Sequence, residues 1–223
     1  MPATRPDRAP LVGRFVRLEP FRLDHLPALW TALGHPEVFA GGYGGGPAGL
    51  PADEAAFAAW APRYFPHETG NTYVVIVNGG PHDGRVVGAS TLGDFDEARE
   101  QAHIGWTGFD PRVWASQVNP ETKLLMLGLA FEHGYGRVKL QADDRNLRSK
   151  AAIAKLGARF EGIERRSIKR ADGSWRDTAI FSILVDEWPG VRAGLEARLA
   201  SFGDESVRFR EHQEHALESE HDR

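Results

Sequence analysis

WASQVNPETKLLML, residues 114–127, joins a polar turn directly to the start of an apolar helix pattern. Helix capping is one interpretation, because Asn119 suits the N-cap position and Pro120 suits the first helical position. Glu121 would then complement the positive end of the helix dipole. A site for an anionic ligand is the other interpretation, because a helix N-terminus presents backbone N–H groups without partners. The surrounding sequence has to distinguish a cap from a binding turn.

Hydrophobic patterns on either side of this stretch predict the secondary structure. Alternating or apolar segments, and the two segments that flank the turn ADGSW, predict strands at 11–20, 72–78, 86–93, 102–109, 137–142, 160–169 and 177–185. Apolar faces with helical spacing predict helices at 24–33, 52–61, 120–133, 146–157 and 189–202. We expect Asp24 and Asn146 to be the N-caps of two of these helices.

The order of these elements predicts the topology. Three consecutive strands after the first two helices indicate an antiparallel meander. The strand–helix–strand unit that follows should cross over with right-handed sense and put strand 137–142 parallel to a neighbour. Asp172 and Gly173 favour a tight hairpin turn between the last two strands. We therefore expect one α+β domain with a mixed, mostly antiparallel sheet of about seven strands.

Both ends of the chain differ in composition from the region between them. Residues 1–10 are rich in Pro and Arg, and we expect them to be unstructured. Residues 203–223 are highly charged and poor in apolar side chains, so we expect a flexible tail there. This leaves one folded domain over residues 11–202.

Composition excludes several classes of protein. A formal net charge of −4 argues against a general nucleic-acid binder, which would carry a basic excess. The absence of Cys removes disulfides, thiolate metal ligands and a Cys nucleophile. The longest apolar run, LLMLGLAF, is far shorter than the ~20 residues that span a bilayer. The N-terminus lacks the apolar segment of a signal peptide, so we expect a cytoplasmic protein. From the net charge and the short apolar runs, we expect neither nucleic-acid nor membrane partners.

Histidine spacing gives no indication of a metal site. The nine His residues include no HExxH-like pair. Three of them, His212, His215 and His221, fall in the expected tail. We therefore expect no bound metal.

Two further stretches carry a resemblance to a known family: HIGWTGFDPRVW at 103–114 and RNLRSKAAIAKLGARFEGIERR at 145–166. With residues 114–127 and the order of elements, they resemble the GNAT N-acetyltransferase superfamily, and within it the ribosomal-protein-alanine acetyltransferases, the RimJ/RimL-like branch. The resemblance covers about residues 11–200 and implies the GNAT fold, with helices on both faces of the sheet. It also implies that acetyl-CoA lies where the strands before and after helix 120–133 splay apart, with its pyrophosphate on the turn at the helix N-terminus.

The turn departs from the family pattern (Gln/Arg)-x-x-Gly-x-(Gly/Ala). Gln117 stands at the middle Gly position and Asn119 at the closing Gly/Ala position. Glycine allows close backbone approach and free φ, so we expect side chains to replace some backbone donors. The resemblance thereby implies cofactor contacts from Trp106, Thr107, Phe109, Ser116, Gln117, Val118, Asn119, Thr122, Lys123, Asn146 and Ser149. Glu121 would repel phosphate unless its carboxylate points away. Core packing by the aromatic residues and simple capping by Asn146 are the alternatives.

Acetyl transfer to an amine needs proton transfers that two residues could perform. The amine must be neutral to attack, the oxyanion must be stabilised, and the departing thiolate benefits from a proton. His103 stands where many relatives have a Glu, and imidazole accepts protons near neutral pH. Ser149 stands where the ribosomal-protein branch has a serine near the CoA sulfur, whereas the tyrosine position of other members is Ile153. A histidine on the other face of the sheet and a helix-start serine without a role are the alternatives.

The loop GGYGGGPAGL, residues 41–50, falls where the resemblance puts the acyl acceptor. Its glycines suggest a mobile lid over the substrate. Tyr43, the only large side chain in the loop, is the candidate substrate contact. A flexible linker without a role in binding is the alternative.

These observations together predict an N-acetyltransferase that uses acetyl-CoA as co-substrate and acetylates a primary amine by direct attack in a ternary complex. The amine is a protein N-terminus or a small molecule, because family likeness does not choose between them. Two alternatives stay open: a non-catalytic acyl-CoA-binding sensor, and an enzyme that uses another donor such as succinyl-CoA. The last helix could pack on its own sheet or across a homodimer.

Overall fold

Eight strands form one sheet in the computed structural model, which describes residues 2–210. Their order across the sheet is β1-β2-β3-β4-β5-β6-β8-β7. The strands are β1 Leu11–Val12, β2 Val16–Pro20, β3 Asn71–Val77, β4 Val86–Asp96, β5 Gln101–Phe109, β6 Arg137–Asp143, β7 Arg159–Lys169 and β8 Trp175–Leu184. Every neighbouring pair is antiparallel except β5 and β6. The predicted α+β class, meander, crossover and final hairpin are confirmed.

The sheet opens at its parallel pair. Residues 101–103 of β5 pair with residues 137–139 of β6, and no pair follows. Beyond this point β5 continues along β4 as far as Phe109, whereas β6 continues along β8 as far as Asp143. The two strands therefore diverge in the middle of the sheet, and their facing edges keep backbone N–H and C=O groups without a strand partner.

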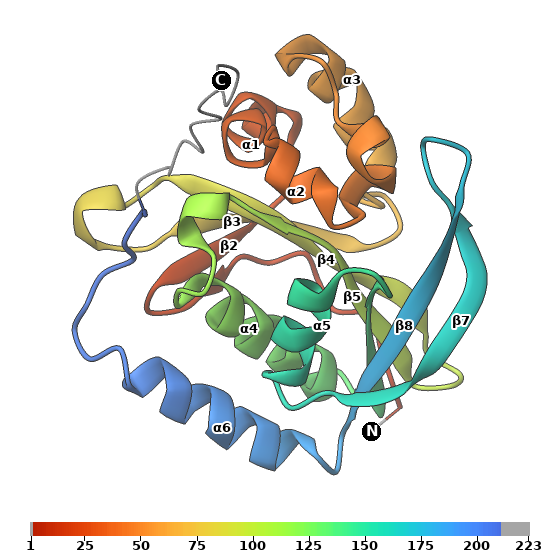
Figure 1. Cartoon of the computed structure of the whole chain (residues 1–223). Coiled ribbons are helices and arrows are strands. Elements are labelled where there is room, and N and C mark those ends of the chain that lie inside the picture. The colour runs from red at the N-terminus through yellow and green to blue at the C-terminus, as the bar shows by residue number, and fades with distance from the viewer. Residues whose placement is uncertain (1, 211–223) are drawn as a thin grey trace, which may run out of the picture.

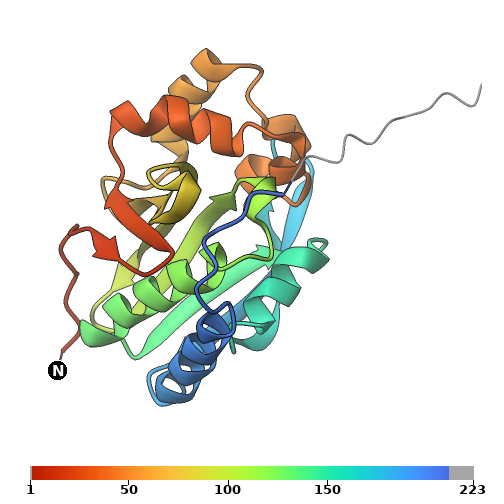
Figure 2. The same cartoon turned by 90° about the vertical axis from the view of Figure 1, so that its left-hand side faces the viewer.

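Helices cover both faces of the sheet, as Figure 1 and Figure 2 show. On one face lie α1 Leu26–Leu33, α2 Pro36–Ala40 and α3 Glu54–Tyr64; on the other lie α4 Val118–Glu132, α5 Leu147–Ala154 and α6 Trp188–Ala200. Within β3, Tyr73 and Val75 belong to the core beneath α4, and Val74 and Ile76 belong to the core beneath α1–α3. Because both faces are covered, β3 is a continuous apolar run rather than an alternating one.

The strand expected over residues 11–20 is two short strands, because a turn between them wraps around a buried carboxylate. The backbone N–H groups of Arg14, Phe15 and Val16 donate to the Glu121 carboxylate at 2.8, 2.6 and 2.7 Å. The sheet consequently has eight strands rather than about seven. This contact also ties the N-terminal edge of the sheet to the first turn of α4.

Glu121→Ala is expected to lower the free energy of unfolding by about 3–5 kcal/mol, because three backbone N–H groups would lose their acceptor. Urea unfolding measures this change. Glu132→Ala, at the exposed end of the same helix, is the matched control and should stay within about 0.5 kcal/mol of wild type. Equal stability of the two variants would contradict the structural role of Glu121.

The first helices differ from their predicted starts. α1 begins at Leu26, and Asp24 lies in a preceding 3₁₀ turn, where its carboxylate accepts hydrogen bonds from the Arg22 guanidinium. Asp24 is therefore not the cap that the sequence suggests. α2 was not predicted, since its five residues are too few to leave a helical period in the sequence.

The predicted caps of α4 and α5 have different outcomes. α4 begins at Val118, with Gln117 rather than Asn119 in the N-cap position. The N-cap of α5 is confirmed, because Oδ1 of Asn146 accepts a hydrogen bond from the Ser149 N–H at 2.9 Å. The polar residues of the opening stretch thus do not all serve to cap α4.

The segment before β1 contacts the domain, which differs from the unstructured state expected for residues 1–10. The Thr4 N–H donates to the His133 carbonyl at 2.9 Å. The Asn71 side-chain amide donates to the Pro6 carbonyl at 3.0 Å. These bonds use backbone groups of the segment, so no apolar pattern in its own sequence announces them.

Residues 203–210 also lie against the domain instead of fraying as expected. Val207 is 1% exposed. The Arg210 N–H donates to the Arg112 carbonyl at 3.0 Å, and Nε2 of Gln117 donates to the Glu205 carbonyl at 3.2 Å. The rest of the expected tail lies outside the described residues, with His212, His215 and His221.

No helix within residues 2–210 has both the length and the apolar character that crossing a membrane requires. The same part of the chain contains no cluster of three or more His, Asp or Glu side chains that could hold a metal ion. The expected absence of membrane and metal partners stays a prediction.

Candidate active site

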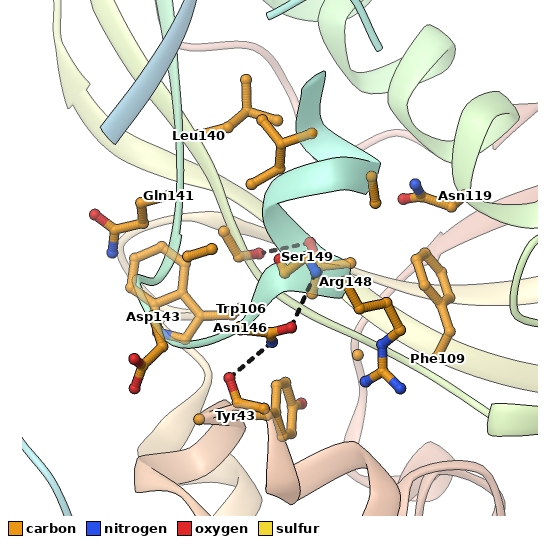
Figure 3. Close-up of a pocket in the computed structure, with 18 of the residues that line it drawn as sticks. Tyr43, Trp106, Phe109, Asn119, Leu140, Gln141, Asp143, Asn146, Arg148 and Ser149 are labelled. Atoms are coloured by element: carbon orange, nitrogen blue, oxygen red, sulfur yellow. Dashed lines mark hydrogen bonds between the residues drawn. The ribbon is translucent and has the colours of Figure 1, made fainter. Parts of the chain in front are cut away.

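A cavity of about 600 Å³ lies where β5 and β6 diverge. The loop at residues 41–45, the N-terminus of α4 and helix α5 bound it (Figure 3). Ten residues that the sequence singled out line this cavity: Tyr43, His103, Trp106, Thr107, Phe109, Ser116, Asn119, Lys123, Asn146 and Ser149. Candidate residues from β5, α4, α5 and the loop are thereby brought around one space.

Three expected cofactor contacts do not face the cavity. Gln117 is 4% exposed and donates to the Glu205 carbonyl. Val118 is buried in the core between the sheet and α4. The Thr122 hydroxyl donates to the Val118 carbonyl at 2.7 Å, a bond that hydroxyls inside helices often form. Contrary to the prediction, these side chains lie on the side of the turn that faces away from the cavity, where they stabilise the turn.

The turn at the start of α4 presents Ser116, Asn119 and Pro120 to the cavity. Ala115, just before it, has a φ of 60°, a left-handed conformation that costs energy for a residue with a side chain. The Ser116 hydroxyl donates to the Val113 carbonyl at 2.6 Å, which stabilises the bend. Among these three, Asn119 is therefore the residue whose side chain can best replace a glycine amide as donor.

Several positive charges lie in the cavity wall. Cζ of Arg148 lies 3.4 Å from the centroid of the Trp114 ring, and Lys155 and Arg198 line the same space. Glu121 points away, because its carboxylate is held by three N–H groups of the β1–β2 turn. The repulsion of phosphate that the sequence raised as a difficulty is therefore avoided.

His103 is 3% exposed and lines the cavity at the point where the strands part. Its Nδ1 lies 2.9 Å from Oδ2 of Asp94. The hydrogen bond from His103 lowers the pKa of Asp94, so the carboxylate is ionised near neutral pH and Nδ1 carries the donated proton. Nε2 is buried and has no hydrogen-bond partner among the described residues. Burial lowers the pKa of His103, which leaves the ring neutral with a lone pair on Nε2.

The surroundings of His103 fix the orientation of its ring. A Cβ atom on Gly105 would lie 2.5 Å from Cε1 of the ring, so only glycine leaves room for it. The Trp106 ring lies against it, with the two centroids 5.2 Å apart. The sequence left open whether His103 faces the site or the opposite side of the sheet, and the structure has it in the cavity wall.

Lys123 is a second titratable group in the cavity wall. It is 4% exposed, and its Nζ donates to the hydroxyls of Ser90 at 2.9 Å and Thr107 at 2.7 Å. Burial lowers the pKa of Lys123 to about 7. Its amine therefore points toward β4 and β5 rather than toward the turn at the start of α4, where the sequence suggested a phosphate contact.

Ser149 lies in the first turn of α5, facing the cavity (Figure 3). Its capping bond uses the main-chain N–H and leaves the hydroxyl free of that role. The amide of Asn146 is engaged at both ends, since Nδ2 donates to the Gly41 carbonyl at 2.7 Å. Capping by Asn146 is thus combined with a tie between α5 and the loop.

The loop at residues 41–50 is held by hydrogen bonds, unlike the mobile lid suggested by its glycines. The Gly44 N–H donates to the Tyr64 hydroxyl at 3.3 Å, and the Gly45 carbonyl accepts from the Ala171 N–H at 3.1 Å. Gly44 and Gly45 have φ values of 59° and 95°, which other residues adopt only at a cost. The glycines therefore allow the loop to adopt this backbone conformation.

Tyr43 packs in an aromatic cluster beside the cavity. Its ring centroid lies 5.4 Å from that of Phe39 and 5.1 Å from that of Tyr64. Its hydroxyl is buried and has no partner within residues 2–210. Burial raises the pKa of Tyr43, so the phenol keeps its proton and can donate to a ligand.

Sequence reasoning missed several residues of the site. Asp94 lies just past an expected strand, and only the pairing of Gly93 with His103 shows that it reaches the ring. Arg176 falls between the expected hairpin turn and the strand after it, which hid its place in the cavity wall. Arg148 could have been found, because it is a basic residue next to Ser149 in the first turn of α5.

Comparison with known proteins agrees with this geometry. A model of the acetyltransferase (GNAT) domain matches residues 16–159. A GCN5-related N-acetyltransferase from Brucella melitensis is 28% identical, with a TM-score of 0.82 over 94% of each chain. A T. thermophilus protein assigned as an acetyltransferase is 33% identical, with a TM-score of 0.75 over 85% of this chain and 96% of that one.

A more distant structure shares the fold. Mycobacterium smegmatis RimJ in complex with CoA-disulfide is 22% identical, with a TM-score of 0.65 over 85% of this chain and 93% of that one. A search of curated proteins gave no match. The domain match extends over more than half of the chain and includes every strand from β2 to β6. The chain therefore belongs to the GNAT acetyltransferase family.

Proposed function

We propose that this protein is an acetyl-CoA-dependent N-acetyltransferase that acetylates a primary amine by direct attack in a ternary complex. The observation that carries the proposal is the unpartnered Nε2 of His103 in the wall of the cavity between the diverging strands. A buried polar atom without a partner is unfavourable unless a ligand supplies one. An attacking amine has an N–H group, and Nε2 can accept a hydrogen bond from it.

Acetyl-CoA suits the residues around the cavity. Arg148, Lys155 and Arg198 offer positive charge to its phosphates. Asn119 offers side-chain donors at the N-terminus of α4, where the helix dipole favours anions. The unpaired edges of β5 and β6 offer hydrogen bonds to the amides of its pantetheine arm. When bound, acetyl-CoA supplies the activated acetyl group.

Two side chains move the protons in this proposal. Nε2 of His103 accepts the proton that the amine loses as it attacks, and Asp94 stabilises the resulting imidazolium through Nδ1. The Ser149 hydroxyl gives its proton to the departing sulfur and regains one from water, to which His103 returns the proton that it took from the amine. Direct transfer requires no covalent enzyme intermediate, which agrees with a chain that contains no Cys.

The fold shared with RimJ supports a place in the RimJ/RimL-like branch. We also infer a cytoplasmic location. Leu195 and Leu199 of α6 are buried within the chain itself, so α6 packs on its own domain. A homodimer would therefore have to use a surface other than this buried face of α6.

Acetyl-CoA at 100 times its Kd is expected to stabilise the protein by about 2.7 kcal/mol, which corresponds to a rise in Tm of roughly 5–10 °C. A melting scan measures the shift. Release of free CoA with a panel of primary amines then measures catalysis. Adenosine alone is the matched control, because it lacks the phosphates and the pantetheine arm.

Each result of these measurements selects one reading. Absence of a shift at millimolar acetyl-CoA would overturn the proposal. A shift without CoA release on any amine would favour a non-catalytic acyl-CoA sensor. A larger shift in Tm and faster release of CoA with succinyl-CoA than with acetyl-CoA would mean that the protein is an acyltransferase with succinyl-CoA as its donor.

A further inference from the structure

Arg176 of β8 is a cation in the cavity wall that lacks a counter-ion of its own. It lines the same cavity as His103 and Ser149. Its Nε is buried and has no hydrogen-bond partner among residues 2–210. Burial lowers the pKa of Arg176, but a guanidinium still remains protonated at neutral pH. A partly desolvated charge of this kind is costly unless something neutralises it.

The carboxylate nearby is already used. Oδ2 of Asp143 accepts two hydrogen bonds from the Arg170 guanidinium, at 2.6 and 3.1 Å. Oδ1 of Asp143 accepts from the Arg145 N–H at 3.1 Å. Both oxygens therefore have partners within the chain. With Arg170, Arg176 and Asp143 in its wall, this corner has one positive charge in excess.

Two phenols stand at the same end of the cavity as this guanidinium. The charge of Arg176 acts on Tyr64, and burial raises the pKa of Tyr64 to about 12, so its hydroxyl stays protonated. That hydroxyl accepts from the Gly44 N–H and keeps its proton for donation. The buried Tyr43 hydroxyl, whose ring packs on Tyr64, has no partner in the described chain. One guanidinium and two phenols thus offer hydrogen-bond donors, and none of the three groups carries a negative charge.

We propose that this corner, formed by Arg176, Tyr64 and Tyr43, binds a carboxylate carried by the acceptor amine. The proposal rests on the acetyl transfer proposed above and names its acceptor class: small amines that bear a carboxylate. A carboxylate has one negative charge, which balances the excess, and its two oxygens can accept several donors. A dianionic phosphate would leave the corner negative, and a neutral carboxamide would leave it positive.

The size of the acceptor follows from how the corner is closed. The Gly45 carbonyl accepts from the Ala171 N–H, so the loop at residues 41–50 meets the tip of the β7–β8 hairpin. Asn146 ties the start of the same loop to α5. These bonds join the loop to α5 and to the hairpin beside this end of the cavity, which favours a small molecule over an extended polypeptide.

Kinetics with matched amines test the proposal. Glycine, β-alanine and 4-aminobutyrate are compared with their carboxamides, and β-alanine also with 2-aminoethylphosphonate. For at least one chain length, wild-type kcat/KM should favour the carboxylate about 10- to 100-fold, as expected for a charge-assisted hydrogen bond. Arg176→Gln should abolish this preference, because the carboxylate and the carboxamide then meet the same neutral side chain. Comparing the ratio between variants cancels differences in amine basicity.

Control variants separate binding from folding. Arg165→Gln, on the exposed part of β7, removes the same charge outside the cavity and should retain the preference. Arg176→Lys should retain part of it, since the charge remains. Without ligand, Arg176→Gln should melt at or above the wild-type temperature, because an unpaired desolvated charge is removed. An assay without turnover uses N-acetyl-β-alanine, which should raise the Tm of wild type and of Arg165→Gln but not that of Arg176→Gln.

The outcomes distinguish this proposal from the function on which it rests. Equal kcat/KM for carboxylates and carboxamides in wild type would overturn the carboxylate subsite and leave the transferase intact. A preference for the phosphonate would overturn the carboxylate subsite and indicate that the corner binds a phosphate-like group instead. Absence of turnover with every amine, together with no stabilisation by acetyl-CoA, would instead overturn the proposed function.

Discussion

Ser149→Ala is expected to lower turnover by about 10²- to 10⁴-fold at saturating acetyl-CoA, the range that a general acid contributes. The main-chain bond from the Ser149 N–H to Asn146 survives the substitution, so α5 keeps its cap. The KM for acetyl-CoA should therefore change little, and the loss should fall on kcat. The rate of CoA release with an accepted amine measures it.

Ser201→Ala serves as the matched control for loss of a hydroxyl. Ser201 follows the end of α6 and is exposed, and its hydroxyl donates to the Arg198 carbonyl in the same helix. Its substitution should leave kcat unchanged. Wild-type turnover in Ser149→Ala would remove this hydroxyl from the mechanism, and a rise in KM alone would make it a binding group.

His103→Gln is expected to lower kcat/KM by about 10²- to 10⁴-fold, because an amide cannot take the proton of the attacking amine. Glutamine is of similar length and can still donate a hydrogen bond to Asp94, so the buried site should keep its packing. His133→Gln, at the C-terminal end of α4 and outside the cavity lining, should retain wild-type kinetics. Steady-state kinetics at one pH measure both variants.

The pH dependence identifies the base. Burial holds the pKa of His103 below its ordinary value of 6.5, so its neutral form persists below that pH. After correction for the fraction of amine that is neutral at each pH, wild-type kcat/KM should fall as the pH drops through this lowered pKa, and His103→Gln should lack that decline. Lys123, whose pKa burial lowers to about 7, would give a decline closer to neutral pH. A decline near pH 7 that survives in His103→Gln would assign the base to Lys123.

The order of strands and helices could be predicted because each element leaves a local pattern. β3, β4 and β5 are largely apolar segments between turn residues, and the hairpin turn at Asp172 and Gly173 appears where the sequence indicates it. The start of α4 could not be placed correctly, since Asn119 and Pro120 fit the first positions of a helix locally. In the structure the helix begins earlier, because the turn before it is held by contacts with distant parts of the chain.

The candidate site could be predicted only in part, because some of its residues depend on contacts with distant parts of the chain. Family resemblance indicated His103 and Ser149, which do line one cavity. Glu121 could be interpreted only by its neighbours, as a dipole partner or as a repellent of phosphate. Its true partners are main-chain N–H groups 105 to 107 positions away. Arg176 is similar, because its lack of a counter-ion follows from bonds that Asp143 makes elsewhere.

The support of Gln117 by the Glu205 carbonyl, 88 positions further along the chain, affects when the molecule becomes able to act. During synthesis α4 can coil as soon as it leaves the ribosome, whereas its first turn gains this brace only after α6 has been made and docked. The end of the cavity at the start of α4 is therefore completed late. A partly synthesised chain would hold most of its sheet before it had the complete proposed site for acetyl-CoA.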